Sequence, residues 1–200
     1  MDESKRCEVR ITGLGGQGVI LCGHIIGKAA ALYDHKFSTM TQSFGPEARG
    51  SACSSQVVIE PENVKYPYVT SADILIALSQ DAFNKFIPEA ARDAVICYDS
   101  SLVTVDKLPS GKQKAYGIPA TRIAEDLGRK IVLNIVMLGF FTAVCDVISQ
   151  RAMRKAVVKS VPKGTEKFNL KAFNEGFDYG IKLKRRLEKN HNEPEPQASK

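Results

Sequence analysis

The sequence predicts a three-layer α/β domain with a mostly parallel sheet and a Rossmann-like first strand-to-helix turn. Three observations support this prediction. A glycine-rich segment lies between a strand pattern and an amphipathic helix pattern within residues 8–33. Continuous apolar runs at 73–78 and 94–98 have the composition of strands buried on both faces. Segments with helical spacing separate these runs, as parallel strands require.

The strands are expected where apolar and β-branched residues concentrate between polar or glycine-containing breaks. The first leads directly into the glycine segment, and the second ends in a run of hydroxyl and amide side chains. In chain order, the six expected strands are 8–12, 37–42, 54–60, 73–78, 94–98 and 112–117.

Each expected helix has its own local signal. The first follows the glycine segment, because the apolar positions from Val19 to Tyr33 fall on one helical face. Ser79 is a suitable N-cap for the next helix, which Pro88 should end or kink. Pro119 marks the start of a third, which reaches Gly128.

The C-terminal part of the chain is expected to be helical. High apolar density predicts a helix packed on several sides at 134–150, which 151–159 either extend or follow as a separate turn. A last helix is expected at 169–188, with Phe173, Phe177 and Ile181 on its buried face. We therefore expect one domain over residues 1–189 and a disordered polar tail at 190–200.

The glycine segment is the first candidate binding loop. Glycine adopts positive φ without strain and has no Cβ to keep a ligand away from the backbone. The N–H groups at the start of the following helix then form a site for an anion, and the Gln17 side chain adds a donor and an acceptor. A tight turn without a ligand is the alternative. The candidate residues are Gly13, Gly15, Gly16, Gln17 and Gly18.

The same region argues against an ordinary NAD enzyme. The dinucleotide fingerprint needs an acidic residue at the end of the second strand to bind the ribose hydroxyls. The second strand pattern instead ends Met40-Thr41-Gln42-Ser43, without Asp or Glu. Lys36 and Arg49 leave NADP open, so a stand-alone NADP- or flavin-binding reductase module is the alternative function.

A second candidate loop follows the second strand. Ligands in open α/β sheets gather at the carboxyl ends of strands, and this loop contains two glycines, a proline and a Glu-x-Arg pair. Arg49 could bind a carboxylate or phosphate through two parallel hydrogen bonds, with Glu47 orienting it. A structural ion pair between the two is equally compatible with the sequence. The candidate residues are Ser43, Gly45, Glu47, Arg49 and Gly50.

Composition excludes several other classes of function. The five cysteines are scattered without a C-x-x-C pair, so we expect reduced, mostly buried thiols and no metal site. The polar N-terminus and the short apolar runs predict a cytoplasmic protein without a membrane span. The net charge of +6 arises in residues 151–200, where thirteen Lys and Arg stand against six Asp and Glu. Nucleic-acid binding is possible for such a segment, but a solvated or subunit-facing helix is favoured.

Together the two loops resemble a known family. Gly13–Val19 combined with Thr41–Cys53 resembles the gamma subunit of 2-oxoacid:ferredoxin oxidoreductases, and the second motif is most similar to the 2-oxoglutarate branch. The segments 73–80 and 134–139 also look like that family. The resemblance covers roughly residues 7–185.

The resemblance implies a role in a larger enzyme. Such enzymes oxidatively decarboxylate a 2-oxoacid on thiamine diphosphate, pass electrons through iron–sulfur clusters to ferredoxin and transfer the acyl group to coenzyme A. It implies alpha, beta and delta partner subunits, the last ferredoxin-like, and no catalytic residue, thiamine or cluster in this chain. The chain would complete the active site and be inactive alone. Asn134 is a further candidate, for which helix capping or a buried hydrogen bond is favoured.

Overall fold

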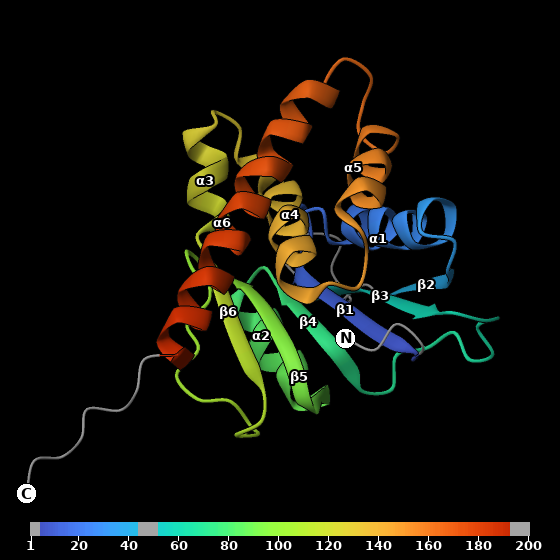
Figure 1. The fold of residues 1–200 in the computed structure, drawn as a ribbon, viewed down its shortest axis with the longest axis vertical. Helices are drawn as coiled ribbons and strands as arrows, with labels where there is room; N and C mark the ends of the chain where they lie inside the picture. The colour runs from blue at the N-terminus through green and yellow to red at the C-terminus, as the bar shows by residue number, and fades with distance from the viewer. Residues whose placement is uncertain (1–4, 44–51, 193–200) are drawn as a thin grey trace, which may run out of the picture.

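The computed structural model describes residues 5–43 and 52–192, which form one six-stranded sheet with helices on both faces (Figure 1). The order across the sheet is β2-β3-β1-β4-β5-β6. The strands are β1 (Cys7–Leu14), β2 (Phe37–Ser43), β3 (Ala52–Glu60), β4 (Ala72–Ala77), β5 (Ala90–Asp99) and β6 (Lys114–Ile118). The helices are α1 (Val19–Tyr33), α2 (Gln80–Phe86), η1 (Ile87–Glu89), α3 (Ala120–Asp126), η2 (Lys130–Val132), α4 (Leu133–Cys145), α5 (Gln150–Val158) and α6 (Glu166–Asn192).

The predicted α/β fold with a mostly parallel sheet is confirmed, with β3 as the exception. β1, β4, β5 and β6 pair in parallel, whereas β3 is antiparallel to both of its neighbours. Eight residues separate Ser43 from Ala52 in the sequence. A parallel crossover needs about a dozen or more, so the chain returns in the opposite direction.

Two apolar cores form on the two faces of the sheet. On β4, Ile74 and Ile76 belong to the larger core with α1 and α4, and Leu75 and Ala77 belong to the smaller core with α2. This alternation is the period of two of a strand that is covered on both faces. Figure 1 shows α2 behind the sheet and α1, α4, α5 and α6 in front of it.

The helix expected at 134–150 is shorter than predicted. α4 ends at Cys145, because Asp146 takes the left-handed conformation with φ 51°. Aspartate tolerates that conformation better than most residues, but it is a weaker stop signal than glycine. The Ser149 hydroxyl then caps α5 by accepting from the N–H of Ala152 at 3.1 Å. Residues 151–158 therefore belong to a separate helix, and Lys159 is its C-cap.

The last helix is longer than predicted, and its buried face is centred on Phe173, Gly176 and Gly180. It covers Glu166–Asn192, so it includes the first residues of the tail expected from 190, and 193–200 lie outside the described residues. Phe173 is fully buried, whereas Phe177 and Ile181 are only half-buried. Built Cβ atoms on Gly139 and Gly176 would overlap carbonyl oxygens of the facing helix, so α4 and α6 pack backbone against backbone.

The five cysteines are buried, as expected, and none of them forms a disulfide. Burial raises the pKa of Cys22 to about 12. Thiols in such surroundings are unreactive, because the nucleophilic thiolate is disfavoured there. No helix in the described part of the chain has the length and apolarity needed to cross a bilayer.

Candidate functional site

The glycine turn lies at the carboxyl end of β1 and opens α1. The N–H of Gln17 donates to the carbonyl of Leu14 at 3.1 Å and closes the turn. Gly16 and Gly18 have φ of 99° and 75°, and Gly15 and Gly16 are exposed. These positive φ values explain why the segment needs glycine, since most other residues would be strained there.

The start of α1 offers unpaired N–H groups. Gly18 occupies the N-cap, and no side chain in the described residues caps this end of the helix. The first intrahelical hydrogen bond runs from the N–H of Cys22 to the carbonyl of Gly18 at 3.0 Å. The N–H groups of residues 19–21, in the first turn of α1, therefore lack helical partners and present a partial positive charge. This arrangement can hold a phosphate or carboxylate.

Gln17 braces the turn through both polar atoms of its amide. Its Oε1 accepts from the N–H of Leu14 at 2.6 Å, and its Nε2 donates to the carbonyl of Leu78 at 2.7 Å. A Cβ on Gly13 would lie 2.7 Å from that Oε1, so glycine at this position makes room for the brace. The Gln17 side chain thereby joins the carboxyl ends of β1 and β4. Because both polar atoms of its amide are engaged, a ligand at this turn would be bound by backbone N–H groups.

Asn134 is brought directly to the glycine turn. It is 4% exposed at the start of α4, and a Cβ on Gly18 would overlap its amide nitrogen. Its Oδ1 accepts from the N–H of Ile135 at 2.9 Å, and its carbonyl accepts from the thiol of Cys22 at 3.6 Å. The close packing of Asn134 on Gly18 fixes α4 against the first turn of α1.

The second candidate loop is only partly described. Its first residue, Ser43, is the exposed end of β2, whereas Gly45, Glu47, Arg49 and Gly50 lie outside the described residues. Both ends of the loop can nevertheless be placed. Ser43 pairs with Ser54, and Leu14 pairs with Ala52. The second loop therefore begins and ends at the same edge of the sheet as the glycine turn.

The structure adds residues to this edge that the sequence patterns did not single out. Ile131, three residues before Asn134, is 74% exposed, more than any other large apolar side chain in the described residues. Asp99 is buried at the end of β5 and accepts from the N–H and the hydroxyl of Thr121 at 3.0 and 2.6 Å. Asp99 could have been found from the sequence, because it directly follows the apolar run at 94–98. No sequence pattern indicated Ile131.

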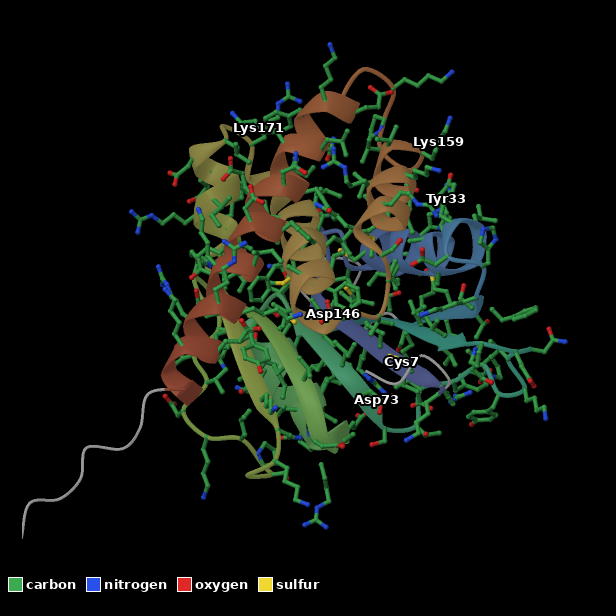
Figure 2. All side chains as sticks on the ribbon, viewed as in Figure 1. Cys7, Tyr33, Asp73, Asp146, Lys159 and Lys171 are labelled. Atoms are coloured by element: carbon green, nitrogen blue, oxygen red, sulfur yellow. The ribbon has the colours of Figure 1, made fainter. Side chains whose placement is uncertain are left out.

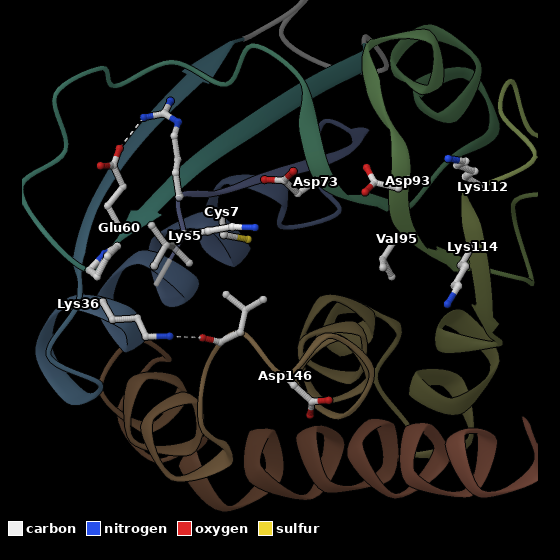
Figure 3. Close-up of a pocket in the computed structure, with 14 residues that line it drawn as sticks. Lys5, Cys7, Lys36, Glu60, Asp73, Asp93, Val95, Lys112, Lys114 and Asp146 are labelled. Atoms are coloured by element: carbon white, nitrogen blue, oxygen red, sulfur yellow. Dashed lines mark hydrogen bonds and ion pairs between the residues drawn. The ribbon is translucent and has the colours of Figure 1, made fainter. Parts of the chain in front are cut away.

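A cavity of about 480 Å³ lies at the edge of the sheet opposite the glycine turn, where β1, β4 and β6 begin. Figure 3 shows Cys7, Asp73 and Lys114 among the residues that line it. Several of its charged groups already have protein partners. Arg6 contacts Glu60 at 2.6 Å, the amine of Lys36 donates to the carbonyl of Val147 at 3.0 Å, and Asp146 pairs with Lys184. Lys36 therefore lies far from the turn, and it cannot serve the NADP site that the sequence left open there.

Buried charge beside this cavity is balanced within the chain. Burial disfavours the charged form of Glu8, but hydrogen bonds from the N–H groups of Ser71 and Thr70 and from Arg6 outweigh it and lower its pKa. Burial raises the pKa of Asp73, although a hydrogen bond from the N–H of Glu8 at 2.8 Å acts to lower it. These contacts hold the start of β1 against the segment that leads into β4. We therefore interpret the charged groups here as stabilising the fold.

Comparison with known proteins identifies the family. The pyruvate ferredoxin/flavodoxin oxidoreductase family matches residues 8–179. The chain belongs to this family. It is 48% identical to the 2-oxoglutarate synthase subunit KorC of Methanocaldococcus jannaschii, over 89% of this chain and 96% of that one. KorC of Methanothermobacter thermautotrophicus is 44% identical, over 86% of this chain and 93% of its own length.

Two solved structures have the same fold. The gamma subunit of a keto/oxoacid ferredoxin oxidoreductase from Geobacter sulfurreducens superposes with a TM-score of 0.77 at 40% identity, covering 88% of this chain and 99% of that one. The 2-oxoglutarate:ferredoxin oxidoreductase of Magnetococcus marinus superposes with a TM-score of 0.79 over 90% of this chain and 31% of its own. At 23% identity that second likeness shows the fold alone.

Proposed function

We propose that this chain is the gamma subunit of a 2-oxoglutarate:ferredoxin oxidoreductase. The observation that carries the proposal is the 48% identity to a 2-oxoglutarate synthase subunit, which extends over almost the full length of both chains. The complex would decarboxylate 2-oxoglutarate oxidatively, transfer the succinyl group to coenzyme A and pass the electrons to ferredoxin. The alternative of a stand-alone NADP- or flavin-binding reductase lacks comparable support, since the relatives named above are oxidoreductase subunits.

The chain's own residues fit an anionic group better than a redox cofactor. Unpaired N–H groups open α1 beside exposed glycines, and a Cβ built on Gly16 would meet no atom within 4 Å. A phosphate of coenzyme A or a carboxylate of a neighbouring subunit could approach this backbone. The five buried cysteines, in contrast, do not form a cluster-binding motif. Thiamine diphosphate and the iron–sulfur clusters are therefore assigned to partner subunits.

The edge that holds both candidate loops is the proposed contact with the rest of the complex. Ile131 is exposed beside Asn134, and Leu102, which follows β5, is 39% exposed at the same edge. Large exposed apolar side chains near a polar loop are typical of protein interfaces. We assign this edge to the alpha, beta and ferredoxin-like delta subunits, and the residues of both loops to positioning coenzyme A or closing the active site.

Co-purification tests the assignment to a complex. An affinity-tagged form of the full chain, expressed in cells that also contain the other subunits, should bring down proteins that carry thiamine diphosphate and iron–sulfur absorbance. The same chain expressed alone should be colourless. Recovery of the chain alone from the first cells, or iron–sulfur absorbance in the second sample, would contradict the proposal.

A further inference from the structure

An open groove of about 440 Å³ lies between the end of α1 and helices α5 and α6. Apolar parts of Tyr33, Val158 and Leu170 line it, and Arg154, Lys155 and Lys159 complete its wall. Figure 2 shows Tyr33 and Lys159 on the same side of the molecule, where α1 ends near α5. We call these six residues the basic groove. It lies at the opposite end of α1 from the glycine turn, about 22 Å along the helix.

The six residues of the basic groove include three cations and no acidic residue. The nearby Asp34 accepts hydrogen bonds from the N–H and the hydroxyl of Ser149, just before α5. Neither α1 nor residues 147–165 include an Asp or Glu, yet together they contain six Lys and Arg. Within the described residues these cations contact neutral groups instead of carboxylates. Lys28 donates to the carbonyl of Lys159 at 3.3 Å, Arg154 donates to the amide oxygen of Asn174, and Lys155 lies 5.8 Å from the ring of Tyr33.

Such a surface is not explained by folding alone. Like charges that lie close together repel one another and destabilise the isolated fold. The preceding residues 1–150 balance fifteen Lys and Arg with sixteen Asp and Glu, so a lack of acidic residues is not general to the chain. An anionic partner would relieve the repulsion and gain from charge complementarity.

The apolar lining of the groove decides between two kinds of anionic partner. A side chain such as Leu can fill a groove lined by Tyr33, Val158 and Leu170, whereas a phosphate backbone would leave it empty. Nucleic-acid grooves of this type also use free aromatic faces for base stacking, but the ring of Tyr33 is approached by the amine of Lys155. Leu32, next to Tyr33, is 60% exposed and adds apolar surface at the rim.

We propose that the basic groove binds an acidic segment of another polypeptide, which places one large apolar side chain between Tyr33, Val158 and Leu170. The carboxylates of the segment pair with Lys155 and Lys159, both of which are exposed. Such a surface gives specificity through the apolar side chain and rapid association through its charge. It is separate from the glycine turn, so the inference does not depend on the role of that turn.

A peptide-binding experiment with the full chain tests the proposal. The probe is a fluorescent Glu-rich peptide of about ten residues with one central Leu, and binding is followed by anisotropy. Replacing two cations by Glu in the double variant Lys155→Glu/Lys159→Glu should weaken binding by at least about tenfold. The matched control Lys112→Glu/Lys114→Glu makes the same charge change at the start of β6, outside the basic groove, and should alter binding less than about threefold.

Two further probes separate charge from groove recognition. A peptide with Ser in place of the central Leu should bind at least about threefold more weakly, since it loses the burial of an apolar side chain. A single-stranded DNA oligonucleotide should bind more weakly than the Leu peptide. Equal effects of the two double variants, indifference to the Leu, or tighter binding of the DNA would each overturn the proposal. Melting curves of both double variants confirm that they are folded.

Discussion

Gly18 has two roles in the glycine segment, one in the conformation of the turn and one in packing against α4. Its positive φ is a property of the turn, and its close contact with Asn134 ties that turn to α4. The sequence predicted the need for glycine here, because the strand–glycine–helix order is a local pattern. The contact with Asn134 joins positions more than a hundred residues apart, and no local pattern reports such a pair.

Replacing Gly18 should destabilise the fold more than replacing Gly16. Gly18→Ala combines strained backbone, at about 1–3 kcal/mol, with overlap between the new Cβ and the amide of Asn134. Gly16→Ala has the backbone cost but open space around it, so about 1 kcal/mol is expected. Urea unfolding of both variants measures the difference. Equal losses would contradict the packing role of Gly18, and Asn134→Ala should restore part of the stability of Gly18→Ala.

Arg49 distinguishes a functional second loop from a structural one. If the loop serves the active site or assembly, Arg49→Ala should leave the stability of the isolated chain within about 0.5 kcal/mol while the turnover of the assembled enzyme falls sharply. Arg49→Lys should recover little turnover, because lysine lacks the planar guanidinium. Melting curves and turnover are measured on the same preparations. Parallel loss of stability and turnover, repeated in Glu47→Ala, would favour a structural ion pair.

Glu8 should make the stability depend on pH. Because its folded pKa is lowered, Glu8 adds stability above its ordinary pKa of about 4.3, and this contribution is lost as the pH falls through the folded pKa. Asp73, whose pKa is raised by burial, acts in the opposite direction. Glu8→Gln should therefore flatten the fall in stability below about pH 5, relative to the unchanged chain.

The measurement for Glu8 is urea unfolding at several pH values. Glu62→Gln is the matched control, since Glu62 is an exposed carboxylate in the connection between β3 and β4. That control should leave the pH profile unchanged. Parallel profiles for the unchanged chain and Glu8→Gln would show that the hydrogen bonds from Thr70 and Ser71 do not lower the pKa of Glu8.

At the scale of elements, the sequence predicted strands and helices well but not all of their limits. The buried strand β4 follows from a continuous apolar run, and α1 follows from apolar positions on one helical face after the glycine segment. The end of α4 at Asp146 depends on a left-handed aspartate, and the antiparallel direction of β3 depends on a short connection. Among the candidate site residues, the glycine turn and Asn134 are now located together, whereas the roles of Glu47 and Arg49 stay predictions.

The packing of α6 gives a direct test at this scale. Phe173 is fully buried against α4, so Phe173→Ala should cost about 3–5 kcal/mol. Phe177 is half-buried, and Phe177→Ala should cost clearly less than Phe173→Ala. Chemical denaturation of both variants provides the comparison. A larger loss at Phe177 would mean that the buried face of α6 is rotated from the one described.

At the scale of the whole molecule, two surfaces face away from each other along α1. The glycine edge carries the candidate loops at one end, and the basic groove lies at the other. A chain with a closed core and two distinct surfaces is suited to a place between other polypeptides. This arrangement agrees with its family, in which the named relatives are enzyme subunits.

The central claim is that this chain is required by a 2-oxoglutarate-oxidising complex and is not itself the catalyst. The most direct measurement is ferredoxin reduction driven by 2-oxoglutarate and coenzyme A, with the remaining subunits assayed with and without the full chain. We expect the chain alone to be inactive, and the remaining subunits to gain activity when it is added. Full activity without the chain, or 2-oxoglutarate oxidation by the chain alone, would contradict the claim.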